Sequence, residues 1–241
     1  MIKLILLLIF MLIFLIGTLP ILLIILLIGL FSMKAERKAA IIFGRIWGRA
    51  LVFFSGSKIE VIGRENVLKG QALLFVGNHR GLFDIPIFYG YTPQCAGFIA
   101  KKELDRIPIV NVWMRCLGCL FIDRSSPRKG AKAIIKGIER IKAGDSLFIF
   151  PEGTRSKTNE MNRFKQGSLK LAEKTGCPII PVALINTDKI FEENGIKLKS
   201  CKCKIIFGKP VILEELTEEE QKNSADYVKA KIQELLDANK I

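Results

Sequence analysis

The stretch Ala72-Leu73-Leu74-Phe75-Val76 consists entirely of apolar residues, and Gly77 and Asn78 follow it directly. A strand that is apolar on both faces is typical of a sheet covered by helices on both sides. The stretch Ser146-Leu147-Phe148-Ile149-Phe150 has the same character farther along the chain. The two stretches therefore predict an α/β fold, with a mostly parallel central sheet flanked by helices.

Five further strands are expected around this pair, and helical patterns alternate with them. Gly176 is placed to end one helix, and Thr217 with Glu220 forms a capping box that begins an acidic C-terminal helix. The expected strands are residues 58–62, 72–77, 97–100, 119–123, 146–150, 179–185 and 202–207, and the expected helices lie near 84–89, 107–114, 129–142 and 167–174.

The N-terminal segment carries no charged side chain from Leu4 to Met33. It is longer than the roughly 20 residues that an apolar helix needs to cross a bilayer, and it lacks the cleavage site of a signal peptide. We therefore expect residues 1–57 to anchor the chain in a membrane. Gly17-Thr18-Leu19-Pro20 interrupts the segment, because proline removes a helix hydrogen bond. A single kinked span and a helical hairpin in one leaflet both fit this pattern.

Basic residues follow the apolar segment at once, which predicts that this end is cytoplasmic. Residues 34–54 have the pattern of a basic amphipathic helix on an anionic membrane surface. A helix packed against its own domain would show the same pattern, so both interpretations stay open. The basic residues are Lys34, Arg37, Lys38, Arg45 and Arg49.

The formal net charge of the chain is +14, and most of the excess lies between residues 58 and 213. Such a basic body favours anionic partners, either phosphate-bearing substrates or a membrane surface. Nucleic acid is not expected as a partner, because the chain has no zinc-finger spacing and no RNA-recognition signature. Cys116 and Cys119 have no second pair to complete a zinc site, so we expect reduced structural thiols and no metal.

His79 is the only histidine of the chain; it follows the first buried strand and stands five residues before Asp84. Active sites of α/β proteins lie where parallel strands end. A carboxylate that binds one ring nitrogen would fix the tautomer and leave the other nitrogen as a base. A lone histidine is more often structural, but this position favours a catalytic role.

Two further runs place arginine at strand ends. Phe150-Pro151-Glu152-Gly153-Thr154-Arg155-Ser156 follows the second buried strand, and Gly118-Cys119-Leu120-Phe121-Ile122-Asp123-Arg124 ends another. Arginine offers a planar fork that suits phosphate, although Arg155 alone would equally suit a solvated turn. Lys101 follows the strand at 97–100. We expect these strand ends to converge on one basic pocket.

Together these runs resemble the glycerolipid acyltransferases, in particular the 1-acylglycerol-3-phosphate acyltransferase family. The family block N-H-x-[S]-x-x-D matches residues 78–84, with Gly81 where serine is common. The blocks G-x-x-F-I-x-R and F-P-E-G-T-R-S match residues 118–124 and 150–156. An apolar block surrounds Pro181, and the K-x-E-L element matches residues 101–104. The order and spacing of the blocks agree over about half of the chain.

The resemblance implies direct acyl transfer without a covalent enzyme intermediate. His79, held by Asp84, would be the general base on the sn-2 hydroxyl of lysophosphatidic acid. Acyl-CoA or acyl-carrier protein would be the co-substrate, phosphatidic acid would be the product, and no other cofactor is implied. Backbone N–H groups near Gly153 are candidate donors to the oxyanion.

The same resemblance implies an acceptor site on a catalytic domain, residues 58–241, at the cytoplasmic face of the cell membrane. Another lysophospholipid or glycerol 3-phosphate remains an alternative acceptor, and a non-catalytic lipid-binding protein is an alternative of another class. The residues expected to bind the acceptor are Lys101, Arg124, Glu152, Gly153, Thr154 and Arg155.

Overall fold

The computed structural model describes residues 2–123, 125–158, 160–195 and 197–240. These residues include a single sheet of seven strands. The strands are β1 (Lys58–Ile62), β2 (Leu74–Gly77), β3 (Gly97–Lys101), β4 (Leu120–Ile122), β5 (Leu147–Ile149), β6 (Ile179–Ile185) and β7 (Lys202–Phe207). Their order across the sheet is β1-β7-β6-β2-β5-β3-β4. Neighbouring strands pair in parallel, except that β6 and β7 are antiparallel. The predicted mostly parallel α/β fold is confirmed.

The expected strands are all present. Those at 58–62, 179–185 and 202–207 agree with the structure to the residue, and the other four differ by one or two residues at one or both ends. The expected acidic C-terminal helix is instead two helices, α8 (Glu218–Lys222) and α9 (Ser224–Ala238). Thr217 caps the first of them through the predicted capping box.

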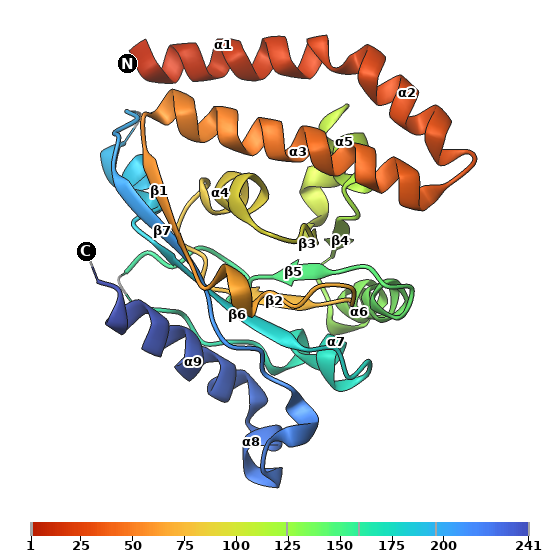
Figure 1. Ribbon diagram of the computed structural model, residues 1–241, viewed down its shortest axis with the longest axis vertical. Coiled ribbons are helices and arrows are strands. Elements are labelled where there is room, and N and C mark those ends of the chain that lie inside the picture. The colour runs from red at the N-terminus through yellow and green to blue at the C-terminus, as the bar shows by residue number, and fades with distance from the viewer. Residues whose placement is uncertain (1, 124, 159, 196, 241) are drawn as a thin grey trace.

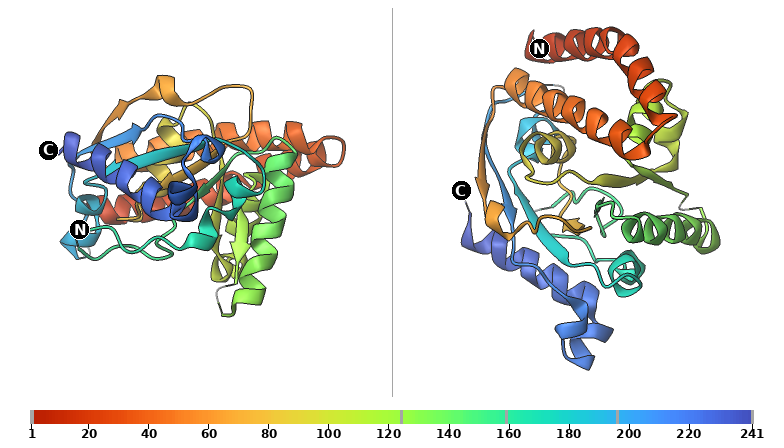
Figure 2. Two further views of the ribbon diagram at one scale, coloured as in Figure 1. Left: turned by 90° about the horizontal axis from the view of Figure 1, so that it is seen from below. Right: turned by 45° about the vertical axis from the view of Figure 1, so that its right-hand side comes forward.

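Helices cover both faces of the sheet, as Figures 1 and 2 show. One face carries α3 (Met33–Ser55), α4 (Asp84–Tyr91) and α5 (Val110–Cys116), and the other carries α6 (Pro127–Lys142), α7 (Lys170–Glu173) and α9. Along β2, Phe75 packs into the core beneath α3 and α4, whereas Leu74 and Val76 pack into the core beneath α7 and α9. This alternation between two buried cores explains why the strand is apolar on both faces.

The helix α3 crosses α4 at very short range. A Cβ atom on Gly48 would lie 2.4 Å from the Pro86 carbonyl oxygen and 2.8 Å from the Gly90 nitrogen. The guanidinium groups of Arg45 and Arg49 donate hydrogen bonds to backbone carbonyls of the segment around α4. Of the two interpretations of residues 34–54, the structure therefore shows a helix packed against its own domain.

The helices α1 (Ile2–Gly17) and α2 (Leu19–Gly29) run over the outer side of α3, away from the sheet (Figure 1). Among the described residues, no single helix has the length and apolar composition to cross a membrane. Leu4–Gly17 and Leu19–Gly29 meet that requirement only as a pair, bent by 45°. The bend falls at the predicted interruption, at Thr18. Many leucine and isoleucine side chains of the two helices remain exposed.

Candidate active site

The end of β2 positions His79. The Asn78 side chain donates a hydrogen bond to the Leu184 carbonyl (2.9 Å) and accepts one from the Leu184 N–H (2.8 Å), which fixes the chain against β6. The His79 Nδ1 atom lies 2.7 Å from Asp84 Oδ2, at the first residue of α4. The predicted pairing of these two side chains is thus present in the structure.

The Asp84 carboxylate is completely buried and accepts several hydrogen bonds. Its Oδ2 atom accepts from the backbone N–H groups of Arg80 (2.8 Å) and Gly81 (3.0 Å) as well as facing His79. Its Oδ1 atom accepts from Thr187 Oγ1 at 2.5 Å. A carboxylate held in this way accepts the Nδ1–H of the imidazole, which leaves Nε2 as the basic nitrogen.

The loop after β5 reaches the same place. The His79 N–H donates to Glu152 Oε1 (2.7 Å), and the Ser156 N–H donates to the His79 carbonyl (2.8 Å). Glu152 Oε2 accepts from the Asn162 N–H (2.8 Å). Burial raises the pKa of the Glu152 carboxyl, while the two backbone N–H bonds oppose the rise. Glu152 therefore connects the loop after β2 to the loop after β5.

Arg155 lies beside the loop that joins His79 to Asp84. Its Nη1 atom donates to Glu192 Oε1 at 2.6 Å, and the same oxygen accepts from the Leu82 N–H at 2.7 Å. The predicted convergence of the first and third sequence blocks is confirmed by these contacts.

The Gly153 N–H donates to the Phe150 carbonyl (3.1 Å) within a turn where Gly153 has a φ of 77°. The Gly153 amide is therefore engaged in the turn, and the role of backbone N–H groups near Gly153 as oxyanion donors stays a prediction. Thr154 follows it and is exposed. The two residues form the surface of the loop that carries Arg155.

Lys101 ends β3 and is exposed at the carboxyl edge of the sheet. The strand β5 separates β3 from β2, so Lys101 stands at the rim of the site and not beside His79. Arg124, the remaining predicted phosphate ligand, lies outside the described residues.

Three residues of the site that follow β6 lie outside every sequence motif described above. Asn186 turns the chain there with a φ of 61°, a conformation that asparagine tolerates better than most residues. Thr187 then meets Asp84, and Asp188 forms an ion pair with Arg80. Because β6 runs parallel to β2, the rule that located His79 also points to this strand end. No local pattern singles out Glu192, which lies farther along the loop.

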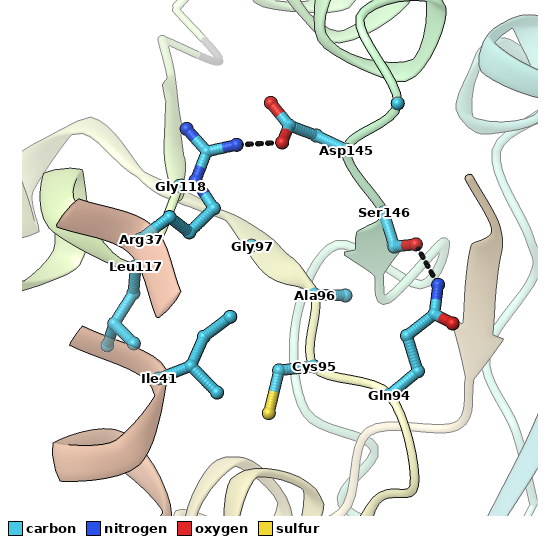
Figure 3. Close-up of a pocket in the computed structure, with 11 residues that line it drawn as sticks. Arg37, Ile41, Gln94, Cys95, Ala96, Gly97, Leu117, Gly118, Asp145 and Ser146 are labelled. Carbon is cyan, nitrogen blue, oxygen red and sulfur yellow. Dashed lines mark hydrogen bonds and ion pairs between the residues drawn. The ribbon is translucent and has the colours of Figure 1, made fainter. Parts of the chain in front are cut away.

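A cavity of about 190 Å³ lies at the amino ends of β3 and β5, at the opposite edge of the sheet. Figure 3 shows the Arg37 guanidinium of α3 paired with Asp145, and Gln94 Nε2 donating to Ser146 Oγ at 2.7 Å. These contacts connect α3 to the sheet. The cavity is lined by none of the predicted site residues.

The chain is similar to known proteins of one family. A family model described as Acyltransferase matches residues 58–185. The 1-acyl-sn-glycerol-3-phosphate acyltransferase of Borreliella burgdorferi is 37% identical over 191 residues, which cover 79% of this chain and 76% of that protein. The protein of the same name from Helicobacter pylori is 36% identical over 182 residues, which cover 70% and 75% of the two chains.

A solved structure shares the fold over nearly the whole length. It is the crystal structure of the 1-acyl-sn-glycerophosphate (LPA) acyltransferase PlsC from Thermotoga maritima, with a TM-score of 0.82 and 26% identity. The match covers 99% of this chain and 96% of that chain. Fold, site geometry and relatives agree: this chain is an enzyme of the acyltransferase family.

Proposed function

We propose that the protein transfers an acyl group from an acyl thioester to the sn-2 hydroxyl of 1-acylglycerol 3-phosphate, which forms phosphatidic acid. The observation that carries this proposal is the pairing of His79 Nδ1 with Asp84 beside Arg155. The His79–Asp84 pair supplies a base, and Arg155 supplies a cation for the acceptor's phosphate. The two relatives named above are acyltransferases named for the same acceptor, 1-acyl-sn-glycerol 3-phosphate.

In the proposed reaction, His79 Nε2 takes the proton of the sn-2 hydroxyl as its oxygen attacks the thioester carbonyl. The tetrahedral intermediate collapses, the carbon–sulfur bond breaks, and His79 returns the proton to the leaving thiolate. The buried Asp84 carboxylate stabilises the imidazolium that exists between these two steps. General base catalysis contributes about 10²–10⁴-fold, and fixing the acceptor through its phosphate supplies much of the remainder.

Arg155, Lys101 and Arg124 are the proposed phosphate ligands. Arg155 is 43% exposed, so its guanidinium is accessible from solvent. It also lies on the loop whose Ser156 N–H binds the His79 carbonyl. A phosphate held there is kept at a fixed position relative to the base, as acyl transfer to one particular hydroxyl requires.

The acceptor is a membrane lipid, and we propose that α1 and α2 attach the enzyme to the cell membrane with the catalytic domain on the cytoplasmic face. Exposed apolar side chains along these helices support attachment, since such a large apolar patch marks a membrane or protein contact. The donor is acyl-CoA or acyl-carrier protein. The proposed reaction needs no resident cofactor.

A substrate panel tests the proposal. Purified enzyme is given lysophosphatidic acid, lysophosphatidylcholine and glycerol 3-phosphate, each with acyl-CoA and with acyl-carrier protein as donor. We expect lysophosphatidic acid to be the preferred acceptor, and His79→Ala to lower kcat by about 10²–10⁴-fold while the protein stays folded. Preference for another acceptor would refute the substrate assignment. Normal turnover by His79→Ala would refute the mechanism, and absence of turnover by the wild-type enzyme with every acceptor would favour a lipid-binding role.

A further inference from the structure

The carboxylate of Glu192 lies between two groups of the proposed active site. Its Oε1 atom accepts both the Leu82 N–H (2.7 Å) and Arg155 Nη1 (2.6 Å). Its Oε2 atom is buried and has no hydrogen-bond partner among the described residues. Leaving a buried acceptor unsatisfied costs free energy. The hydrogen bonds to Oε1 therefore stabilise this conformation of the Glu192 side chain, whereas the unsatisfied Oε2 destabilises it.

Gly81 provides the space that Glu192 occupies. A Cβ atom on Gly81 would lie 2.8 Å from Glu192 Oε2. This is the position at which the resembling family commonly has serine. Glycine in place of the common serine therefore allows the Glu192 side chain to occupy this position.

The phosphate of a bound substrate and the Glu192 carboxylate compete for the guanidinium of Arg155. A phosphomonoester presents three oxygens and binds arginine through parallel, charge-assisted hydrogen bonds. Glu192 offers Arg155 a single oxygen that it shares with the Leu82 N–H. The phosphate is therefore the stronger ligand for the guanidinium whenever the acceptor is bound.

Glu192 can leave Arg155 without disturbing the catalytic pair. The loop is anchored earlier, where Asp188 pairs with Arg80 and Thr187 binds Asp84. Glu192 begins a separate short turn, Glu192–Asn194, four residues beyond Asp188. A rotation of the Glu192 side chain keeps both anchors in place.

We propose that Glu192 is an exchangeable counter-anion of Arg155. It pairs with the guanidinium in the free enzyme, is displaced by the acceptor's phosphate, and returns as the product leaves. The inference rests on the proposed function, because lysophosphatidic acid and phosphatidic acid carry the same phosphate group. Glu192 thereby weakens the binding of substrate and product alike, which prevents the enzyme from retaining its product.

Glu192→Gln tests the exchange, because the amide keeps an oxygen for the Leu82 N–H and removes only the charge. We expect the KM for lysophosphatidic acid and the inhibition constant of phosphatidic acid to fall together, roughly two- to fivefold for a partly exposed pair. The KM for acyl-CoA stays unchanged, which a general structural defect would not produce. Glu193→Gln alters the exposed neighbouring carboxylate and is the matched control, expected to change none of the three constants.

A binding measurement separates this inference from the proposed function. His79→Ala and His79→Ala/Glu192→Gln are compared for binding of phosphatidic acid in detergent micelles, which needs no turnover. Tighter binding by the double variant, by the same factor as above, supports the exchange. Equal or weaker binding by the double variant would show that Glu192 stays bound to Arg155 when phosphatidic acid binds, and would overturn the proposed exchange. Failure of the proposed function appears elsewhere, as absence of lysophosphatidic acid turnover by the wild-type enzyme.

Discussion

The imidazole ring of His79 stacks on the phenyl ring of Phe150, with centroids 4.0 Å apart and planes 13° from parallel. Phe150 follows β5 directly, so the same loop that carries Arg155 also supports one face of the base. The ring of His79 is thereby held with Nδ1 toward Asp84. A buried aromatic neighbour of this kind restricts the histidine to one rotamer.

Phe150→Leu removes the stacked surface and keeps the site apolar. We expect kcat to fall about tenfold, because base catalysis depends on the geometry of the proton acceptor, while the KM of both substrates changes little. Steady-state kinetics measures the effect, and thermal unfolding of the variant serves as the control for folding. A kcat equal to that of the wild type would show that Asp84 alone orients the ring.

Asp84→Asn distinguishes the charge of the carboxylate from its geometry. The Arg80 and Gly81 N–H groups both point at Oδ2, so they favour the amide oxygen at that position and leave the His79 tautomer unchanged. We expect kcat to fall about a hundredfold or more, since the imidazolium that forms during the reaction loses the negative charge that stabilises it.

Asp84→Ala is the companion variant, because it leaves those N–H groups and the Thr187 hydroxyl without an acceptor. It is expected to lower the free energy of unfolding by about 3 kcal/mol or more, on the basis of about 1–3 kcal/mol for each unsatisfied group. Denaturant titration measures this loss. An Asp84→Asn enzyme as destabilised as Asp84→Ala would contradict the assignment of the amide oxygen.

Thr187→Val removes the hydroxyl that donates to Asp84 Oδ1 and preserves the shape of the side chain. We expect a loss of about 1 kcal/mol in stability and a fall in kcat of roughly three- to tenfold, since one oxygen of Asp84 is then unsupported. Thr187→Ser keeps the hydroxyl and is expected to retain most of the activity. If serine and valine behave alike, the hydroxyl does not position Asp84.

Much of the fold is predictable from local patterns. The strand at 72–77 is apolar on both faces because Phe75 and its neighbours Leu74 and Val76 enter separate cores, and sequence reveals this directly. The packing of α3 was not predictable in the same way. Its basic amphipathic pattern fits either a membrane surface or α4, and the short contact at Gly48 decides between them.

The site was predictable where its residues directly follow strands. His79 and Glu152 are such residues, and the parallel sheet brings their strand ends together. Thr187 also follows a parallel strand, but a threonine at a strand end does not by itself indicate a functional site. Glu192 was not predictable, because its position depends on a turn and on the missing side chain of Gly81. Contacts between distant loops leave no periodic signal in the sequence.

The Sγ atoms of Cys201 and Cys203 lie 3.2 Å apart as free thiols. A hydrogen bond from Cys203 lowers the pKa of Cys201 to about 7, whereas burial raises the pKa of Cys95. Alkylation by iodoacetamide, which requires the thiolate, is therefore expected to reach its half-maximal rate at Cys201 near pH 7 and at Cys95 only at higher pH.

Peptide mass spectrometry over a pH series measures both rates in one sample. Cys203→Ala removes the hydrogen-bond donor and is expected to move the alkylation midpoint of Cys201 upward, toward the ordinary thiol value of about 8.5. Coincident profiles for Cys201 and Cys95 would contradict the lowered pKa.

Gly81→Ala tests whether Glu192 depends on the missing side chain. The new methyl group would lie 2.8 Å from Glu192 Oε2 and 3.1 Å from the Asp188 nitrogen and the Thr187 oxygen. We expect a loss of about 1–3 kcal/mol in stability, as for other overpacked sites, together with a lower KM for lysophosphatidic acid because Glu192 is pushed away from Arg155. Adding Glu192→Ala removes the first of these clashes. The double variant should therefore lose less stability than the two single variants combined, and strictly additive losses would show that Gly81 and Glu192 are uncoupled.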